Sequence, residues 1–264
     1  MTLDFSSGKV LIGVVHLLPL PGSPGFGGSF RKILDGAVAD ALAYEKGGAT
    51  AVIIENFGDV PFTAGMVAPE TLAGMARAGA AVREAIRLPV GFNVLRNDAR
   101  SALGLAAACE GSFIRVNVHT GAMLTDQGLL QGNAYETVRV RKQLCPQTQI
   151  FADVHVKHAT PLGDEPLEYA ARDAWERGGA DALIISGSGT GLPALTTDVE
   201  TVRRVCPEAP ILIGSGFSVE NACGFRPLIN GAIVGTSLKR NGRVNHPVDA
   251  ARVKSLVRAM RGPA

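Results

Sequence analysis

Few cysteines, few aromatic residues and little net charge narrow the classes of protein to which this chain can belong. Its 264 residues include only four cysteines, and they lie far apart with no C-x-x-C pair. Disulfide scaffolds and zinc knuckles need closer cysteines, so we expect reduced thiols in a cytoplasmic protein. Aromatic residues make up 5%, and 26 basic residues face 24 acidic ones. Without a basic stripe or stacking aromatics, a nucleic-acid polymer is not an expected partner.

Long apolar segments and common cofactor motifs are also missing. The most apolar run, residues 10–18, is interrupted by His16, so neither a signal peptide nor a membrane span is expected. No G-x-G-x-x-G follows the first apolar run and no G-x-x-x-x-G-K-[ST] occurs, so no organic cofactor is predicted. The metal motifs H-x-H and H-E-x-x-H are absent too. A divalent metal on His16, Asp153 and His155 therefore stays a weaker alternative to a metal-free site.

The chain does contain a regular alternation of apolar runs and amphipathic segments. Strands are predicted at 10–16, 51–54, 90–94, 113–118, 149–156, 182–185, 211–213 and 231–234. Helices are predicted at 33–46, 69–86, 99–109, 134–144, 166–177, 199–205 and 248–260. This alternation, at a length typical of barrels, predicts a single α/β domain over residues 1–264, a (β/α)8 TIM barrel with eight parallel strands.

Two further stretches refine this prediction. Residues 44–54 resemble residues 175–185, so the second predicted strand corresponds in sequence to the sixth, four units later. This spacing favours duplication of a half-barrel over chance similarity. Residues 17–28 are rich in proline and glycine and form a loop. Its length favours a lid over the barrel mouth, and a solvated connection is the alternative.

Polar residues gather where the predicted strands end. Barrel active sites lie at this C-terminal face, so together they indicate a site, although each alone could be an ordinary polar residue. They are His16, Glu55, Asn56, Asn93, Arg96, Asn97, Asn117, His119, Asp153, His155, Lys157 and His158.

The fifth strand carries the main catalytic candidates. Asp153, His155 and Lys157 alternate and so share one side, which should face the barrel interior. Asp153 is a candidate general base, with Glu55 as its partner acid or base. Lys157 and His155 would stabilise developing negative charge, and Lys157 could instead form a Schiff base. The plainer alternative is an Asp153–Lys157 pair that neutralises itself.

Substrate hydroxyl and carbonyl groups need uncharged or cationic partners at the same face. Asparagine side chains do not exchange protons at ordinary pH, so they suit hydrogen bonding to such groups. The candidate substrate-binding residues are His16, Asn56, Asn93, Arg96 and Asn117.

Small residues follow the last three predicted strands and suit an anion site. Backbone N–H groups in such loops can approach a phosphate, and the loops after strands seven and eight form the usual phosphate cradle of a barrel. The alternative is that the glycines only allow tight turns. The candidates are Ser186, Gly187, Ser188, Gly189, Gly214, Ser215, Gly216, Gly235, Thr236 and Ser237.

Several of these stretches resemble one known family. Gly13–Pro24, Ile54–Phe62, Gly91–Asp98, Phe113–Val118 and Ala152–His158 resemble the BtpA/SgcQ family over nearly the whole chain. The resemblance implies a barrel similar to those that bind ribulose phosphate. Family members are linked to photosystem I biogenesis or associated with sugar-utilisation genes, so the resemblance leaves the reaction open.

Three functional hypotheses follow. The first is an enzyme that acts on a phosphorylated sugar or a sugar-phosphate nucleoside by acid–base chemistry, as an isomerase, a lyase or a glycosidic-cleavage enzyme. The second is a non-catalytic assembly or stability factor that keeps the barrel. The third is a Schiff-base aldolase acting through Lys157. A small phosphorylated molecule is the expected partner, and a homo-oligomer is expected because such barrels often associate.

Overall fold

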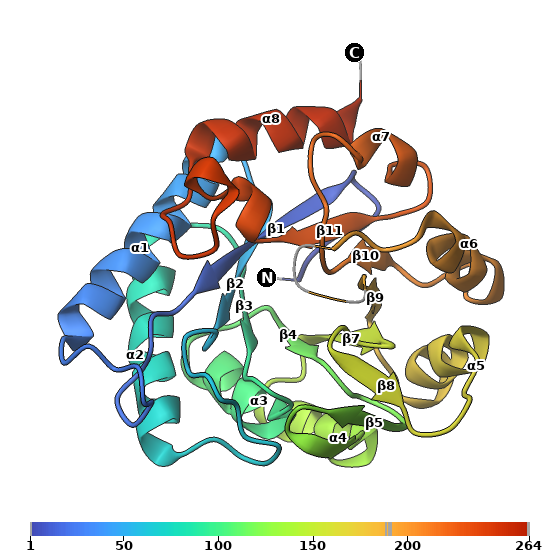
Figure 1. Ribbon diagram of the computed structural model, residues 1–264, viewed down its shortest axis with the longest axis horizontal. Helices are drawn as coiled ribbons and strands as arrows, with labels where there is room; N and C mark the ends of the chain where they lie inside the picture. The colour runs from blue at the N-terminus through green and yellow to red at the C-terminus, as the bar shows by residue number, and fades with distance from the viewer. Residues whose placement is uncertain (1, 188, 190–191, 263–264) are drawn as a thin grey trace.

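The chain forms a closed barrel of eight parallel strands (Figure 1). The computed structural model describes residues 2–187, 189 and 192–262. Around the barrel the strands run in the order β1-β11-β10-β9-β7-β4-β3-β2, so the first and last strands of the chain pair directly. Their bounds are Val10–His16 (β1), Ala51–Glu55 (β2), Val90–Asn93 (β3), Phe113–Val116 (β4), Gln149–Val154 (β7), Ala182–Ile185 (β9), Ile211–Ile213 (β10) and Gly231–Val234 (β11). The predicted fold is confirmed.

Helices surround the barrel and connect its strands (Figure 1). The largest, α1, begins after the capping Ser29, whose hydroxyl accepts a hydrogen bond from the Lys32 amide, and ends at the left-handed Gly48. The α-helices are Phe30–Gly47 (α1), Pro69–Ala85 (α2), Ala99–Ala108 (α3), Ala134–Leu144 (α4), Leu167–Arg172 (α5), Thr196–Val205 (α6), Ala222–Phe225 (α7) and Ala250–Arg261 (α8). Helix α5 continues as a π-helical turn, Asp173–Arg177, and 3-10 turns occupy Thr236–Leu238 and Arg240–Gly242.

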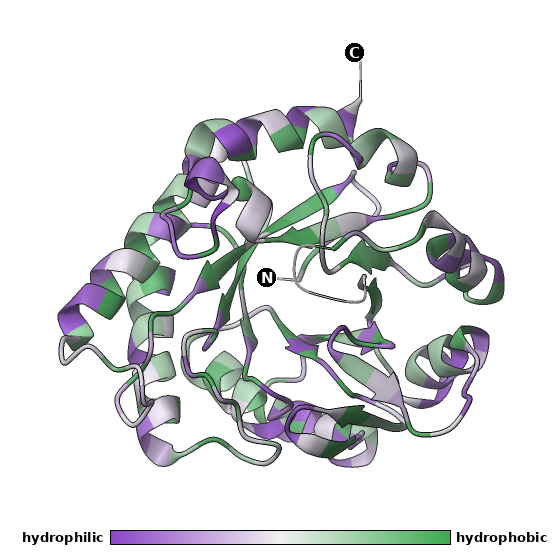
Figure 2. Cartoon of the chain, viewed as in Figure 1, coloured by the Kyte–Doolittle hydropathy of each residue, from purple (hydrophilic) through white to green (hydrophobic). Residues whose placement is uncertain are grey.

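The strands carry apolar residues on both faces, because one face fills the barrel and the other packs under the helices. Most of the strand ribbon is accordingly green, the colour of hydrophobic residues, in Figure 2. The inward residues include Val10, Ile12, Phe113, Phe151 and Ile184. The rings of Phe113 and Phe151 stack at a centroid distance of 4.8 Å. Apolar side chains thus fill the barrel up to the last turn of inward residues. The polar residues that follow on the same inward faces lie at the C-terminal ends of the strands.

A small antiparallel sheet was not predicted. It is formed by β5 (Ala122–Thr125), β6 (Gly128–Gln131) and β8 (Ala159–Pro161), in the order β6-β5-β8, outside the barrel at its C-terminal end (Figure 1). Its inner face has its own apolar cluster, which includes Met123 and Leu130. Forming this sheet requires the chain to leave the barrel early, so β4 and β7 are each two residues shorter than the predicted strands.

The proline- and glycine-rich segment after β1 lies against the neighbouring helix. The Leu20 amide donates to Asp59 at 2.7 Å, and the Leu20 side chain lies next to Gly74 of α2. In this structure the segment does not line the pocket at the barrel mouth, in contrast to the predicted lid. Among the described residues, no helix is long and apolar enough to cross a membrane.

Candidate active site

A pocket of about 310 Å³ opens at the C-terminal end of the barrel. The alternation of β1, β2 and β4 points their last inward residues, His16, Glu55 and Arg115, into this space, because the inward residues before them fill the barrel. The pocket brings together His16, Glu55, Lys157 and the predicted loops after β10 and β11, and it adds Arg115 and Arg252. Its described lining also includes Phe57, Phe217, Ser218 and Gly242.

Arg115 holds the floor of the pocket together. From β4 it donates two hydrogen bonds to the Asp153 carboxylate, from Nε at 2.8 Å and from Nη2 at 2.9 Å, while its Nη1 lies 3.5 Å from Glu55 Oε1. Burial lowers the pKa of Arg115, but pairing with Asp153 and Glu55 outweighs burial and raises this pKa above its ordinary value. Arg115 is therefore a fixed cation, which sequence reasoning missed. Its signal was a charged residue on the inward face of an apolar strand, two positions before Asn117.

Asp153 is enclosed beneath the pocket. Its side chain is 0% exposed, and it also accepts hydrogen bonds from Asn117 Nδ2 at 3.0 Å and from Ser186 Oγ at 3.2 Å. Its oxygens are occupied by these partners, and it does not line the pocket. Asp153 therefore positions Arg115, which is its partner in place of Lys157, and its role as a general base stays a prediction.

The residues after β7 do not continue its alternation. The strand ends at Val154, and His155 has a left-handed backbone with φ of 50°. His155 is not part of the pocket lining, and its Nε2 is a buried atom without a hydrogen bond among the described residues. Burial lowers its pKa, whereas Glu165 and Asp198 near α5 and α6 raise it. The predicted shared face for Asp153, His155 and Lys157 is therefore wrong, because the backbone turns between them.

Lys157 nevertheless reaches the pocket from this turn. Its backbone carbonyl accepts a hydrogen bond from Arg96 Nη2 at 2.6 Å, which fixes the chain here. Burial lowers the pKa of the Lys157 ammonium, and Arg115 lowers it further, against a smaller opposing effect of Glu55. Arg96 thus holds the backbone of a pocket residue rather than lining the pocket itself.

His16 and Glu55 are adjacent on paired strands, in register at the ends of β1 and β2. Burial lowers the pKa of His16 to about 3, and the nearby cations Lys239, Lys157 and Arg115 lower it further. The imidazole is therefore neutral near pH 7 and serves as a hydrogen-bonding group. Its ring packs on Phe57 at a centroid distance of 4.4 Å, and its Nδ1 is buried without a partner among the described residues.

The three predicted asparagines are occupied within the protein. Asn93 donates to Asn117 Oδ1 at 3.0 Å and to the Arg115 carbonyl at 3.1 Å, which extends the network around Asp153. Asn56 accepts from the Leu95 amide at 2.7 Å and so ties two loops together. None of the three lines the pocket, so their arrangement supports the site from beneath or beside it and does not match the predicted contact with substrate.

The loops after β10 and β11 form one wall of the pocket. A Cβ on Gly235 would lie 2.6 Å from His16 Cε1, so any larger residue there would have to displace the His16 ring. Gly216 has φ of 64°, and a Cβ on it would lie 2.3 Å from the backbone of Pro193. Arg252 of α8 donates from Nε to the Ser237 carbonyl at 2.8 Å and lines the pocket, so this wall gains a cation.

The predicted loop after β9 lies behind this wall. Ser186 binds Asp153, a Cβ on Gly187 would meet the Leu192 carbonyl at 2.3 Å, and the Gly189 carbonyl accepts from Ser215 Oγ at 3.1 Å. These three residues support the other loops and do not line the pocket. Ser188 lies outside the described residues.

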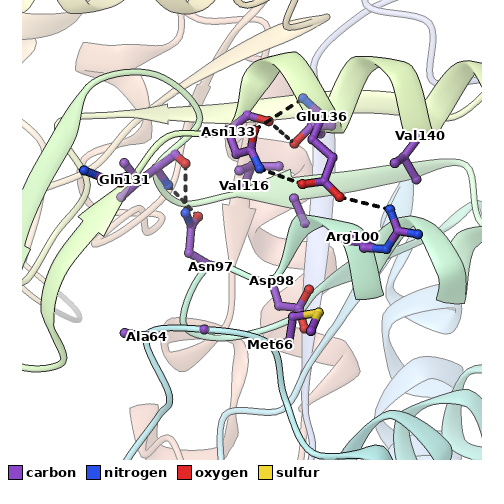
Figure 3. A pocket seen from close by; sticks show the side chains of 14 residues that line it. Ala64, Met66, Asn97, Asp98, Arg100, Val116, Gln131, Asn133, Glu136 and Val140 are labelled. Carbon is purple, nitrogen blue, oxygen red and sulfur yellow. Dashed lines mark hydrogen bonds and ion pairs between the residues drawn. The ribbon is translucent and has the colours of Figure 1, made fainter.

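A second hollow, of about 220 Å³, lies between α3 and α4 on the outer side of β4 (Figure 3). Its charged side chains contact one another: Glu136 accepts from Asn133 at 2.7 Å and from Arg100 at 2.9 Å. Of the polar residues predicted at the strand ends, Asn97 lines it, and no predicted catalytic, substrate-binding or phosphate-binding residue does. In the described part of the chain, no group of three or more histidine, cysteine, aspartate or glutamate residues could hold a metal ion.

A sequence model of the BtpA family matches residues 7–262 of this chain. The chain belongs to the BtpA family. Within that family it is 44% identical to "Photosystem I biogenesis protein BtpA" of Synechocystis sp., over 97% of this chain and 89% of the relative. It is 30% identical to "Putative sgc region protein SgcQ" of Escherichia coli, over 94% of this chain and 93% of the relative.

Solved structures share the barrel at much lower identity. A Mycobacterium tuberculosis tryptophan synthase chain matches with a TM-score of 0.65 and 16% identity, over 98% of this chain and 97% of that one. Phosphoribosyl anthranilate isomerase of Thermus thermophilus matches with a TM-score of 0.57 and 13% identity, over 94% and 96%. At these identities the likeness concerns the fold.

Proposed function

We propose that this BtpA-family protein is an enzyme that acts on a small phosphorylated sugar by acid–base chemistry. The observation that carries the proposal is the meeting, in one pocket, of a carboxylate, a lysine with a lowered pKa and two glycine loops. Acid–base catalysis needs groups of different character within reach of one substrate, and loops of this kind bind phosphate in other barrels. The names of neighbouring folds, phosphoribosyl anthranilate isomerase among them, agree with a phosphorylated substrate.

Each group has a role in this proposal. The backbone of the loops after β10 and β11 binds the phosphate, and Arg252 pairs with it at the pocket wall. Glu55 transfers a proton at the carbon next to the sugar carbonyl. Arg115 and Lys157 stabilise the negative charge that develops on the carbonyl oxygen, and the neutral His16 donates or accepts a hydrogen bond there.

The size of the pocket favours a sugar phosphate over a nucleotide. A volume of about 310 Å³ lies at the lower end of the range for small-molecule sites. A sugar phosphate without a base matches this space better, so proton transfer beside a carbonyl is favoured over cleavage of a glycosidic bond. Isomerisation and lyase chemistry both begin with that proton transfer.

A thermal-shift panel of sugar phosphates, nucleotides and inorganic phosphate tests the proposal. A ligand at about a hundred times its Kd stabilises the native state by about 2.7 kcal/mol, so a sugar phosphate should raise the Tm. Arg252→Ala should reduce that rise, whereas Arg258→Ala, on the exposed side of the same helix, should leave it unchanged. Glu55→Gln should keep the rise and lower kcat by about a hundredfold or more.

The opposite result would favour a second candidate, a non-catalytic assembly factor. The printed name of the Synechocystis relative is the observation behind it, together with the exposed cross-strand leucines Leu124 and Leu129. If no phosphorylated compound raises the Tm and Glu55→Gln has no effect in cells that need the protein, the enzyme proposal fails and contact through those leucines is the better explanation.

A further inference from the structure

The Lys157 amine lines the pocket without a partner in the described part of the chain. Within the described residues, the structure gives its Nζ neither a hydrogen bond nor an ion pair, although the side chain lines the pocket. Lys239, the other lysine near His16, differs in this respect, because its Nζ lies 3.2 Å from Asp40 Oδ2. The first amine is free to meet a ligand and the second is not.

The surroundings of Lys157 favour its neutral form. Burial lowers the pKa of its ammonium group, and two guanidinium groups add to this effect while two carboxylates oppose it. One of those carboxylates, that of Asp153, is already bound by Arg115 through two hydrogen bonds. The charged groups that act on the amine are Arg115, Glu55, Asp153 and Arg96.

The backbone of Lys157 is held in place as well. Arg96 donates to its carbonyl at 2.6 Å, and the chain turns sharply at His155 just before it. A nucleophile whose backbone is fixed in this way, in the same pocket as the loops after β10 and β11, can meet a carbonyl carbon with little further ordering.

We propose that Lys157 Nζ forms an imine with the carbonyl carbon of a phosphorylated aldose or ketose in this pocket. The inference rests on the proposed function and adds the substrate's reacting group, a free aldehyde or ketone, and a covalent intermediate. It differs from acid–base chemistry alone, in which Lys157 would contribute only charge.

The step balances without another reactant. The amine lone pair attacks the carbonyl carbon, a proton moves from nitrogen to the former carbonyl oxygen, and a carbinolamine results. Its hydroxyl leaves as water after it takes one more proton, the one that Glu55 receives from the Lys157 ammonium before the neutral amine attacks, and the C–N bond becomes the iminium. The Glu55 carboxylate then removes a proton from the adjacent carbon, and the electron pair moves toward the positively charged nitrogen.

Borohydride trapping tests this inference. The full-length protein is incubated with dihydroxyacetone phosphate, glyceraldehyde phosphate or ribose phosphate, reduced with sodium borohydride, digested and analysed by mass spectrometry. We expect an adduct of the reduced sugar phosphate on Lys157, with Lys239 unmodified in the same digest. The adduct yield should increase with pH as the amine loses its proton.

Lys157→Arg provides the matched variant, because it keeps a positive charge and cannot form an imine. This variant should lose the adduct while its Tm still rises with the same sugar phosphate. A Tm rise in the wild type without an adduct on Lys157 would overturn the imine and leave the proposed function standing. No Tm rise with any phosphorylated compound would overturn both.

Discussion

At the residue scale, the pairing of Arg115 with Asp153 decides which charged groups line the pocket. Each stands on the inward face of its strand, and the low dielectric of the barrel interior makes an unpaired charge there very costly. The two side chains, 3% and 0% exposed, therefore satisfy each other, and Glu55 is the carboxylate that lines the pocket. The metal-free site and the absence of an organic cofactor remain predictions.

His16 should make the stability of the protein depend on pH. Its pKa is about 3 in the folded state against an ordinary 6.5, so between these values only the unfolded chain takes up the proton. Stability should fall as the pH drops below the ordinary value, and this group should have no effect above it. One pKa unit corresponds to about 1.4 kcal/mol, so between about pH 6.5 and pH 5 His16 should cost about 2 kcal/mol.

Urea unfolding of the wild type and of His16→Gln at about pH 7 and about pH 5 checks this. The variant should lose less stability between the two conditions, by about 2 kcal/mol. The control, His246→Gln, removes a histidine outside the pocket and should behave as the wild type does. Equal losses in the wild type and His16→Gln would contradict the prediction.

At the scale of elements, α1 anchors the segment that follows the loop after β11. Asp40 of α1 pairs with Lys239 at 3.2 Å and accepts a hydrogen bond from the Val248 amide at 2.8 Å. Lys239 is a buried part of this anchor. The anchor fixes the chain that leads from the loop after β11 to α8, and α8 carries Arg252.

Removing Asp40 should therefore destabilise the protein strongly. Asp40→Ala leaves the Lys239 ammonium buried and unpaired, which costs about 3–5 kcal/mol in such cases. Asp35→Ala is the control on the same helix, because Asp35 pairs with Arg31 where the side chains are 60% and 82% exposed, and it should cost less than about 1 kcal/mol. Similar unfolding free energies for the two variants in urea would contradict this role for Asp40.

At the scale of the whole molecule, the first and last barrel strands hold the chain as one unit. Strands β1 and β11 pair over four positions, and Tyr44 of α1 bridges them by donating to the carbonyl of Val14 at 3.0 Å and to that of Val234 at 3.4 Å. The two similar segments, residues 44–54 and 175–185, run into β2 and β9, and these strands are not neighbours in the barrel order. The single domain and the homo-oligomer remain predictions.

One closed sheet predicts one cooperative unfolding transition. Trp175, which packs against the main core, reports on the β7–β9 side by fluorescence, and far-ultraviolet circular dichroism reports on all helices. The two urea curves should coincide, because neither half of the barrel can keep its sheet when the other unfolds. Separate midpoints would show that the halves unfold independently.

The sequence by itself determined the barrel and the face on which the site lies. Strands such as Val10–His16 are apolar on both faces, and the polar residue that ends this strand lies on its inward side, because side chains alternate strictly along a strand. That rule placed His16, Glu55, Gly214 and Gly235 in the pocket without any knowledge of tertiary contacts.

Only the tertiary structure decided which of these groups remain available to a substrate. Arg115 and Asp153 are 38 residues apart and meet because β4 and β7 are neighbours, while the excursion through β5, β6 and β8 ends both strands early. The turn at His155 separates His155 from the pocket and brings Lys157 into it. Which buried charges pair, and where the chain leaves a barrel strand, depend on contacts between distant segments. The local pattern of residues does not contain that information.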